Sequence, residues 1–252
     1  MATIGIFDSG SGGLSVLKEM LKVLPDERYI YYSDNANCPY GEKTAEFICE
    51  RAESICSMLI ERGAEIIVVA CNTATAAAIA SLRKRFAIPF VGMEPAVKPA
   101  ALGTRSGVIG VLATEGTLKA SKYLNTKDRF SGGVRIEEHV GRGFVELVES
   151  LELDGKRARG VVEASLLPLL EAGADVIVLG CTHYPFLLPL MESIAKERGY
   201  EVRFIDPAPA VSRHLVEVAA EHGISSADPN PGVILMSSGP KESLERLYRS
   251  IL

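Results

Sequence analysis

Short apolar runs alternate with longer amphipathic stretches along the whole chain. The apolar runs are rich in β-branched residues and predict strands at 3–7, 29–33, 66–70, 108–112, 176–180, 202–205 and 233–237. Helical periodicity fills the stretches between them, most clearly over 44–62 and 160–172. Strands that alternate with helices in this way form parallel sheets covered by helices, so the pattern predicts an α/β protein.

One internal repeat predicts two similar halves. The segment GAEIIVVAC at 63–71 aligns with GADVIVLGC at 173–181, and a weaker echo relates 4–9 to 109–114. Each strong copy consists of a glycine at a helix end, a buried strand and a cysteine at the strand's carboxyl end. Similar halves commonly face each other across a cleft, and ligands of parallel sheets bind beyond the carboxyl ends of the strands. We therefore expect two parallel sheets facing a central cleft, with Cys71 and Cys181 at its edges.

Charge and hydropathy argue against nucleic-acid and membrane partners. The net charge is −5, and the one dense basic cluster, 83–85, falls at an expected helix end, where cations suit the helix dipole. The longest charge-free stretch, 66–82, is interrupted by polar residues and is shorter than the roughly 20 apolar residues that a transmembrane helix needs. The start of the chain does not resemble a signal peptide, so we expect a cytoplasmic protein with reduced thiols.

The five cysteines show no spacing typical of a metal or redox centre. They stand at 38, 49, 56, 71 and 181, and no two form the C-x-x-C pattern of a zinc ribbon or a thioredoxin-type motif. A Cys-x-His pair at 181–183 is too small a ligand set for a metal, so no metal is expected. Cys49 and Cys56, seven residues apart on a predicted helix, are expected in the core.

Polar residues follow both repeated cysteines, which favours chemistry over packing. Cys71 is followed by Asn72 and Thr73 at a predicted helix start, where free N–H groups lower a thiol pKa and bind carboxylates. Cys181 is followed by Thr182 and His183, and the histidine offers a proton relay. The alternatives are a small buried thiol at Cys71 and a structural histidine at His183.

Two turns after the first strands supply further candidates. Asp8 and Ser9 open a glycine-rich turn whose spacing fits neither the Rossmann fingerprint nor a P-loop, so the turn is expected to let the backbone approach another ligand. A cap for the following helix is the alternative role of Asp8. Tyr40 and Gly41 follow Pro39 in a rigid turn. The serine hydrolase alternative fails because the chain has no G-x-S-x-G elbow.

Five motifs together resemble one enzyme family. They read GIFDSGSGGLSVL, DNANCPYGEKT, VVACNTATAAA, VLATEGT and VLGCTHYPFL, and they follow the family's order from residue 5 to 188. With two cysteines at equivalent strand ends, the chain resembles the cofactor-independent glutamate racemases of the aspartate/glutamate racemase superfamily. The resemblance implies two flavodoxin-like domains, one formed by 1–93 with about 208–252 and the other by 94–207.

The resemblance also implies roles for individual residues. Cys71 and Cys181 would be the acid/base thiols, Asp8 would assist Cys71, and His183 with Glu149 would assist Cys181. No cofactor and no metal would take part. The implied substrate contacts are Asp8, Ser9, Tyr40, Gly41, Asn72, Thr73, Thr114, Thr117, Thr182 and His183.

The chain departs from the family pattern near Glu149. Many members have Cys-Pro before the Phe-Val run, whereas this chain reads HVGRGF at 139–144. Glu146 lies three residues from Glu149 on the same predicted helix face and is the alternative assisting carboxylate.

The implied activity is conversion of L-glutamate to D-glutamate for peptidoglycan synthesis, with glutamate as the small-molecule partner. Members of the family are often homodimers. Three alternatives stay open: a racemase of aspartate or another acidic amino acid, a non-catalytic two-lobed amino-acid binding module, and a thiol redox enzyme. The redox alternative requires the Cα atoms of Cys71 and Cys181 to lie about 4.4–6.8 Å apart.

Overall fold

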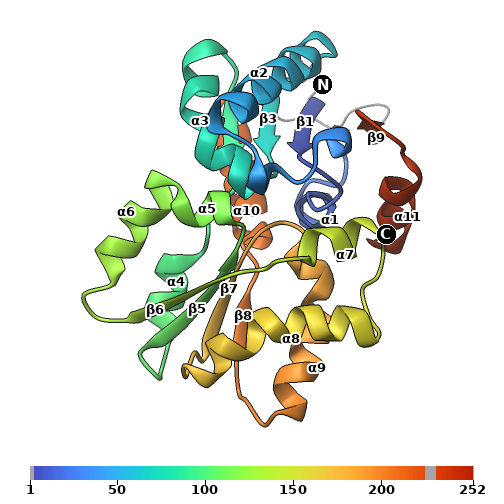
Figure 1. The fold of residues 1–252 in the computed structure, drawn as a ribbon. Coiled ribbons are helices and arrows are strands. Elements are labelled where there is room, and N and C mark those ends of the chain that lie inside the picture. The colour runs from blue at the N-terminus through green and yellow to red at the C-terminus, as the bar shows by residue number, and fades with distance from the viewer. Residues whose placement is uncertain (1–2, 225–230, 252) are drawn as a thin grey trace. The chain divides into compact units, whose positions relative to one another are not determined.

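The computed structural model describes residues 3–224 and 231–251. The chain folds into two compact units, Met1–Met93 with Ala208–Leu252, and Glu94–Pro207. Each unit contains one parallel sheet with helices packed against it (Figure 1). The chain is therefore an α/β protein, as the alternation of strands and helices predicts.

The first unit contains a five-stranded parallel sheet. The strands lie in the order β4-β3-β1-β2-β9. All pairings are parallel, so all carboxyl ends meet at one edge, where Asp8 of β1 lies opposite Ser33 of β2. The strands are β1 (Thr3–Asp8), β2 (Arg28–Ser33), β3 (Ile66–Val69), β4 (Phe90–Gly92) and β9 (Gly232–Ser237).

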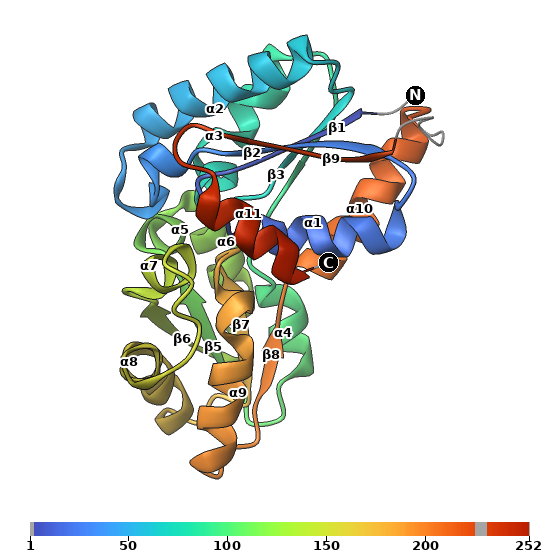
Figure 2. The ribbon, with the colours of Figure 1, turned by 90° about the vertical axis from the view of Figure 1, so that its right-hand side faces the viewer.

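Helices cover both faces of this sheet. In Figure 2, α2 and α3 lie above it and α1, α10 and α11 lie below it. This division follows from right-handed crossovers, because connections that run in opposite directions across a sheet place their helices on opposite faces. The bounds are α1 (Leu14–Val23), α2 (Ala45–Glu61), α3 (Asn72–Arg85), α10 (Ala208–Glu221) and α11 (Glu242–Ile251), with short 3-10 turns η1 (Asn35–Asn37) and η2 (Tyr40–Glu42) after β2.

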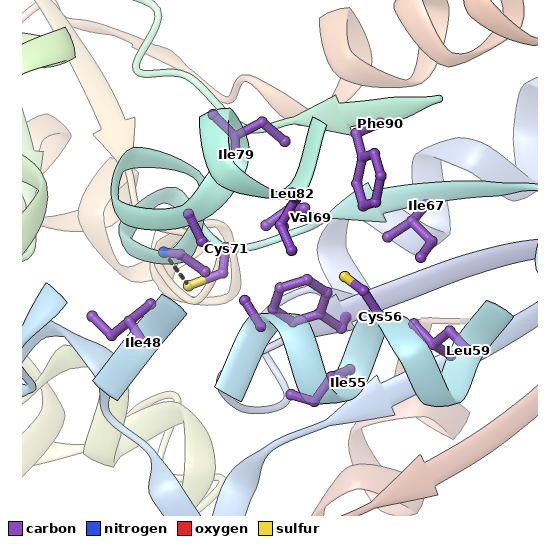
Figure 3. Packing of buried hydrophobic residues seen from close by; sticks show 14 of the residues in the cluster. Ile48, Ile55, Cys56, Leu59, Ile67, Val69, Cys71, Ile79, Leu82 and Phe90 are labelled. Carbon is purple, nitrogen blue, oxygen red and sulfur yellow. Dashed lines mark hydrogen bonds between the residues drawn. The ribbon is translucent and has the colours of Figure 1, made fainter. Parts of the chain in front are cut away.

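Apolar side chains between the sheet and α2 and α3 form the core of the first unit. Figure 3 shows Ile55, Cys56 and Leu59 of α2 packed beneath residues of β3 and α3. Removing such side chains from water stabilises the fold by roughly 25 cal/mol per Å² of apolar surface. Cys71 lies at the end of this cluster. The strand end that carries the thiol is thus held by a closely packed layer.

The second unit repeats the strand arrangement of the first. Its four strands lie in the order β6-β5-β7-β8, and all pair in parallel. The neighbours β3-β1-β2 of the first sheet thus correspond to β7-β5-β6 of the second. In both units the strand before the repeated cysteine pairs with the unit's first strand. The strands are β5 (Val108–Ala113), β6 (Arg135–Val140), β7 (Val176–Gly180) and β8 (Arg203–Ile205).

Helices also cover both faces of the second sheet. α8 and α9 pack against each other on one face, and α4 and α6 pack on the other (Figures 1 and 2). The bounds are α4 (Val97–Gly103), α5 (Glu115–Lys119), α6 (Ser121–Phe130), α7 (Phe144–Glu149), α8 (Lys156–Glu171) and α9 (Leu188–Glu197), with a 3-10 turn η3 (Tyr184–Leu187) after β7.

The seven predicted strands all form, each with its ends within one residue of the prediction. The strands β4 and β6 were not predicted. β4 has three residues, too few for a visible pattern. β6 is an edge strand with the sequence RIEEHV, and its side chains are exposed or only partly buried. Three of its six residues are charged, so it lacks the apolar run that predicts a strand. The helix ends before both repeated strands use glycines at positive φ, Gly63 at 93° and Gly173 at 90°.

The helices of the structure can be compared with the expectations for the basic cluster and for a membrane-spanning segment. The basic cluster 83–85 forms the last turn of α3, as predicted. Across residues 3–224 and 231–251, no helix has both the length and the apolar content needed to cross a membrane.

Candidate active site

Cys71 caps the helix that follows β3. Its backbone is extended, and its Sγ accepts a hydrogen bond from the Ala74 N–H at 3.4 Å, drawn as the dashed line in Figure 3. The first N–H groups of a helix lack partners within the helix and carry a positive partial charge. Both effects stabilise a thiolate at this position.

Asp8 lies at the end of β1, next to β3, and is fully buried. Its Oδ1 accepts the N–H of Ser9 at 2.7 Å, and its Oδ2 accepts the N–H of Gly13 at 2.6 Å. A Cβ at Gly13 would lie 2.9 Å from the Asp8 Cβ, so the turn needs glycine there. Asp8 therefore holds the glycine-rich turn. The alternative of a helix cap at Asp8 is wrong, because the N-cap position of α1 is Gly13. A carboxylate has about four acceptor sites, so this role leaves capacity for a proton.

Ser9 lies between Asp8 and Cys71. The Cys71 thiol donates to the Ser9 Oγ at 3.7 Å, and the Ser9 hydroxyl donates to the Asp8 Oδ1 at 3.4 Å. The three groups come together because β1 and β3 are adjacent parallel strands whose carboxyl ends share one edge. The resulting chain of donors and acceptors is a path by which the thiol can lose a proton.

The side-chain amide of Asn72 is buried at the start of α3. Its side chain is 4% exposed, and among the described residues neither its Nδ2 nor its Oδ1 has a hydrogen-bond partner. Leaving a buried polar group unsatisfied costs about 1–3 kcal/mol. An amide kept at this cost beside the Cys71 thiol indicates a polar ligand. Thr73, the next residue of α3, is also buried.

Tyr40 directs its hydroxyl into the protein. The ring is buried, and the phenol donates to Asp34 Oδ2 at 2.5 Å. Burial and the neighbouring Asp34 carboxylate raise the pKa of Tyr40 well above its usual range, so the phenol stays protonated. The substrate contact implied for this turn must then come from the backbone or from Gly41, which follows in η2.

In the second unit His183 bridges a thiol and a carboxylate. Cys181 follows β7, and its Sγ lies 3.8 Å from His183 Nδ1. His183 Nε2 lies 2.7 Å from Glu149 Oε1. All three side chains are buried or partly buried. Because an imidazole accepts at one nitrogen and donates at the other, this arrangement can move a proton to or from the thiol.

The same geometry does not suit metal binding by these three residues. The thiol and the carboxylate contact opposite nitrogens of the His183 ring. One ion cannot bind both nitrogens of one ring, so Cys181, His183 and Glu149 cannot all ligate a single metal in this arrangement.

Packing around α7 selects Glu149 over Glu146 as the partner of His183. The rings of Phe144 and Tyr184 meet edge to face, with centroids 4.9 Å apart. A Cβ on Gly141 would lie 2.5 Å from the Tyr184 Oη, so glycine permits this contact. With α7 held against η3, Glu149 contacts the histidine with a side chain 21% exposed, while Glu146 is exposed.

The threonines implied as substrate contacts lie at the carboxyl edge of the second sheet. Thr114 follows β5 directly, and its Oγ1 lies 3.0 Å from the Thr117 Oγ1. Ala113 and Gly180, the residues before Thr114 and Cys181, pair in register. Thr114 and Cys181 therefore follow neighbouring strands at the same level. Thr182 is buried.

Two charged residues near the site were not identified from the sequence. Asp34 and Arg51 form an ion pair beside Tyr40, with an Nη2–Oδ1 distance of 2.7 Å; Asp34 is fully buried and the Arg51 side chain is partly exposed. Asp34 stands in the quoted motif DNANCPYGEKT, but Arg51 comes from the middle of α2. Only the contact of α2 with the turn after β2 reveals the pair.

We predict that Cys56 resists alkylation in the folded protein. It is fully buried, and burial raises the pKa of its thiol to about 12. A rise of about three pKa units lowers its thiolate fraction about 1,000-fold at pH 8. Mass spectrometry after timed iodoacetamide treatment will measure each site. Cys38, which is partly exposed, serves as the reference, and equal rates at both cysteines in native buffer would contradict the prediction.

Comparisons with known proteins agree on one family. The sequence model of Asp/Glu/Hydantoin racemases matches residues 4–215. The chain is 45% identical over 252 residues to the glutamate racemase of Ectopseudomonas mendocina, covering 100% of this chain and 95% of that protein.

Solved structures give the same result. The structure of Escherichia coli glutamate racemase in complex with L-glutamate and activator UDP-MurNAc-ala matches with a TM-score of 0.86 and 36% identity, covering 99% of this chain and 95% of that one. Glutamate racemase from Francisella tularensis in complex with D-glutamate matches with a TM-score of 0.83 and 28% identity, covering 100% and 93%.

Proposed function

The chain belongs to the Asp/Glu/hydantoin racemase family, and on that premise we propose that it interconverts L- and D-glutamate with two cysteine acid/bases. Its full-length likeness to glutamate racemases supports glutamate over aspartate as the substrate. The observation that carries the two-base mechanism is the repetition of one arrangement. In the first unit Cys71 follows β3 and is linked through Ser9 to the carboxylate of Asp8. In the second unit Cys181 follows β7 and is linked through His183 to the carboxylate of Glu149.

In the proposed reaction, the thiolate of one cysteine removes the α-hydrogen of glutamate as a proton. The C–H bond breaks, an S–H bond forms, and the electron pair stays on the α-carbon and its carboxylate. The thiol of the other cysteine then donates its proton to the opposite face, which inverts the centre. The proton transfers balance without an electron acceptor. The mechanism requires the two sulfurs to approach one α-carbon from opposite faces, and one thiol in each unit meets the need for two separate bases.

Each thiol has a partner that can change its protonation. An ordinary thiol of pKa about 8.5 is only a few per cent ionised at pH 7, so assistance raises the reactive fraction. On the side of Cys71, Ser9 and Asp8 take up the proton, and the α3 N-terminus stabilises the thiolate. On the side of Cys181, His183 takes up the proton and Glu149 stabilises the imidazolium.

Substrate binding in this proposal uses uncharged donors. The N–H groups at the glycine-rich turn and the buried amide of Asn72 would bind carboxylate oxygens and stabilise the charge that develops on them. The threonines 73, 114, 117 and 182 would add hydroxyl donors. We further propose that the protein works in the cytoplasm as a homodimer and supplies D-glutamate for peptidoglycan synthesis.

The experiment that tests the proposed function is proton NMR of the purified protein with L-glutamate in D2O, beside an L-aspartate control. We expect the α-proton signal of glutamate to disappear as D-glutamate accumulates, with deuterium in the product at early times. Exchange with aspartate alone would overturn the substrate. Absence of exchange with either amino acid, while both thiols titrate as free, would reject the racemase and favour an amino-acid binding module.

We predict that Glu149→Gln lowers kcat about 10- to 100-fold, because the amide cannot stabilise a charged His183. Glu146→Gln is the matched control, three residues earlier on the same short helix and exposed. It should change kcat less than twofold. Initial rates in both directions will measure the effects. A larger loss in Glu146→Gln than in Glu149→Gln would assign the assisting role to Glu146.

A further inference from the structure

Asp34 is a fully buried carboxylate that no step of the proposed reaction uses. Its side chain has 0% exposure and lies just beyond β2. Arg51 of α2 binds it with both arms of the guanidinium, Nε to Oδ2 at 3.0 Å and Nη2 to Oδ1 at 2.7 Å. Asn37 and Tyr40 donate to the same carboxylate, at 3.1 Å from Asn37 Nδ2 to Oδ1 and 2.5 Å from Tyr40 Oη to Oδ2.

These contacts keep Asp34 charged inside the protein. Burial by itself would raise the pKa of its carboxyl, but the hydrogen bonds, that of Arg51 foremost, outweigh burial and hold the pKa below its ordinary value. Charge-assisted bidentate pairs are the most directional hydrogen bonds available to side chains. The carboxylate thus fixes where Tyr40 lies relative to α2.

The segment around Asp34 is also tied to two other parts of the first unit. The Asp34 N–H donates to the backbone oxygen of Asp8 at 2.9 Å, directly beside the carboxylate of the proposed site. The Asn35 side chain contacts Pro240 O and Ser237 Oγ, each at 2.7 Å, in the segment after β9. The turn that carries Tyr40 and Gly41 is therefore braced from the end of β1, from α2 and from the end of β9.

We propose that Asp34, held by Arg51, is a positioning residue that presets the turn carrying Tyr40 and Gly41 for substrate and thereby sets the affinity for glutamate. The inference rests on the proposed function. The Tyr40 hydroxyl is bound to Asp34, so the turn can offer substrate its backbone only if that anchor holds. Preorganised donors bind a ligand without the cost of ordering a loop. Loss of the anchor should then weaken substrate binding more than it slows the proton transfers.

The test compares Arg51→Met and Arg51→Lys with Arg62→Lys. Arg51 is 29% exposed, and methionine keeps an unbranched apolar side chain at this position. Arg62 immediately follows α2, is exposed, and contacts Met58 Sδ, which makes it a matched control. We expect Arg51→Met to raise KM about 10-fold, equal to about 1.4 kcal/mol, with kcat changed less than threefold. Arg51→Lys should restore part of the loss, since it keeps the charge without the fork. Arg62→Lys should match the parent protein.

The outcomes separate the inference from the proposed function. If the parent protein racemises glutamate but Arg51→Met leaves KM within twofold, or lowers kcat alone, the positioning role is wrong. If the parent protein does not racemise glutamate, the proposed function itself has failed. If Arg51→Met does not fold, Asn37→Ala removes another side-chain contact to Asp34 and leaves Tyr40 and Gly41 in place. It should raise KM several-fold with kcat nearly unchanged, and an unchanged KM would again overturn the inference.

Discussion

Cys71→Ser and Cys181→Ser should each lower kcat for glutamate racemisation about 1,000-fold or more. Each substitution replaces a thiol by a hydroxyl, which is far less acidic and does not provide a thiolate-like base near neutral pH. Both cysteines are buried at strand ends, so a water molecule cannot easily take the place of a missing thiol as the base. The loss corresponds to about 4 kcal/mol of transition-state stabilisation.

Hydrogen exchange gives the sharper form of this prediction. A variant with one working base should still exchange the α-hydrogen of one glutamate enantiomer with D2O, and the two variants should differ in which enantiomer exchanges. Cys49→Ser is the control, because Cys49 is partly buried and its thiol donates to the Ala77 backbone oxygen, a bond that serine can keep. It should leave kcat within twofold. Racemisation by either active-site variant at more than about a tenth of the parent rate would contradict the two-thiol mechanism.

Asp8→Asn should lower kcat/KM about 100-fold and also destabilise the fold. The carboxylate accepts two backbone N–H groups, and the amide presents a donor to one of them. Leaving one buried N–H unsatisfied costs about 1–3 kcal/mol. The larger effect on rate follows because the neutral amide cannot take up the proton that Cys71 releases through Ser9. Steady-state rates and urea unfolding will measure the two effects.

Asp175→Asn is the control that separates the structural role of Asp8, which is to accept backbone N–H groups, from its proposed catalytic role. Asp175 also accepts backbone N–H groups, from Arg105 at 2.7 Å and Ser106 at 3.1 Å, but it precedes β7 and lies at the amino edge. Burial by itself would raise its pKa, and the hydrogen bonds, that of Thr104 first, lower it to about 2. Asp175 therefore stabilises the fold above about pH 4 and loses this contribution as the pH falls through about 2. Asp175→Asn should reduce stability at pH 7 and leave kcat/KM unchanged. A comparable loss of activity in both variants would make the role of Asp8 purely structural.

The positions of the strands could be predicted because burial is reflected in the local sequence. Residues 66–70 and 176–180 are continuous apolar runs, since strands inside a covered parallel sheet are buried on both faces. The edge strand β6 could not be predicted in this way, since its partly solvated side chains carry charges that hide the pattern. The three-residue strand β4 depends on its partner β3 for its hydrogen bonds.

In the candidate site, too, some features follow from the local sequence and others from tertiary packing. The repeat in the sequence alone determined that two cysteines follow equivalent strands. The features that mark each strand are local in sequence: a glycine at the end of the preceding helix, an apolar run, and polar residues at the carboxyl end. Only the tertiary structure decided which groups meet these thiols. The order of the strands brings Asp8 and Ser9 to Cys71, and the packing of Tyr184 on Phe144 turns Glu149 rather than Glu146 toward His183. Arg51 meets Asp34 through helix packing alone. These contacts join residues that are far apart in the chain, so no short-range sequence pattern predicts them. Their free energy comes from burial and hydrogen bonding that arise only when the helices and strands pack together.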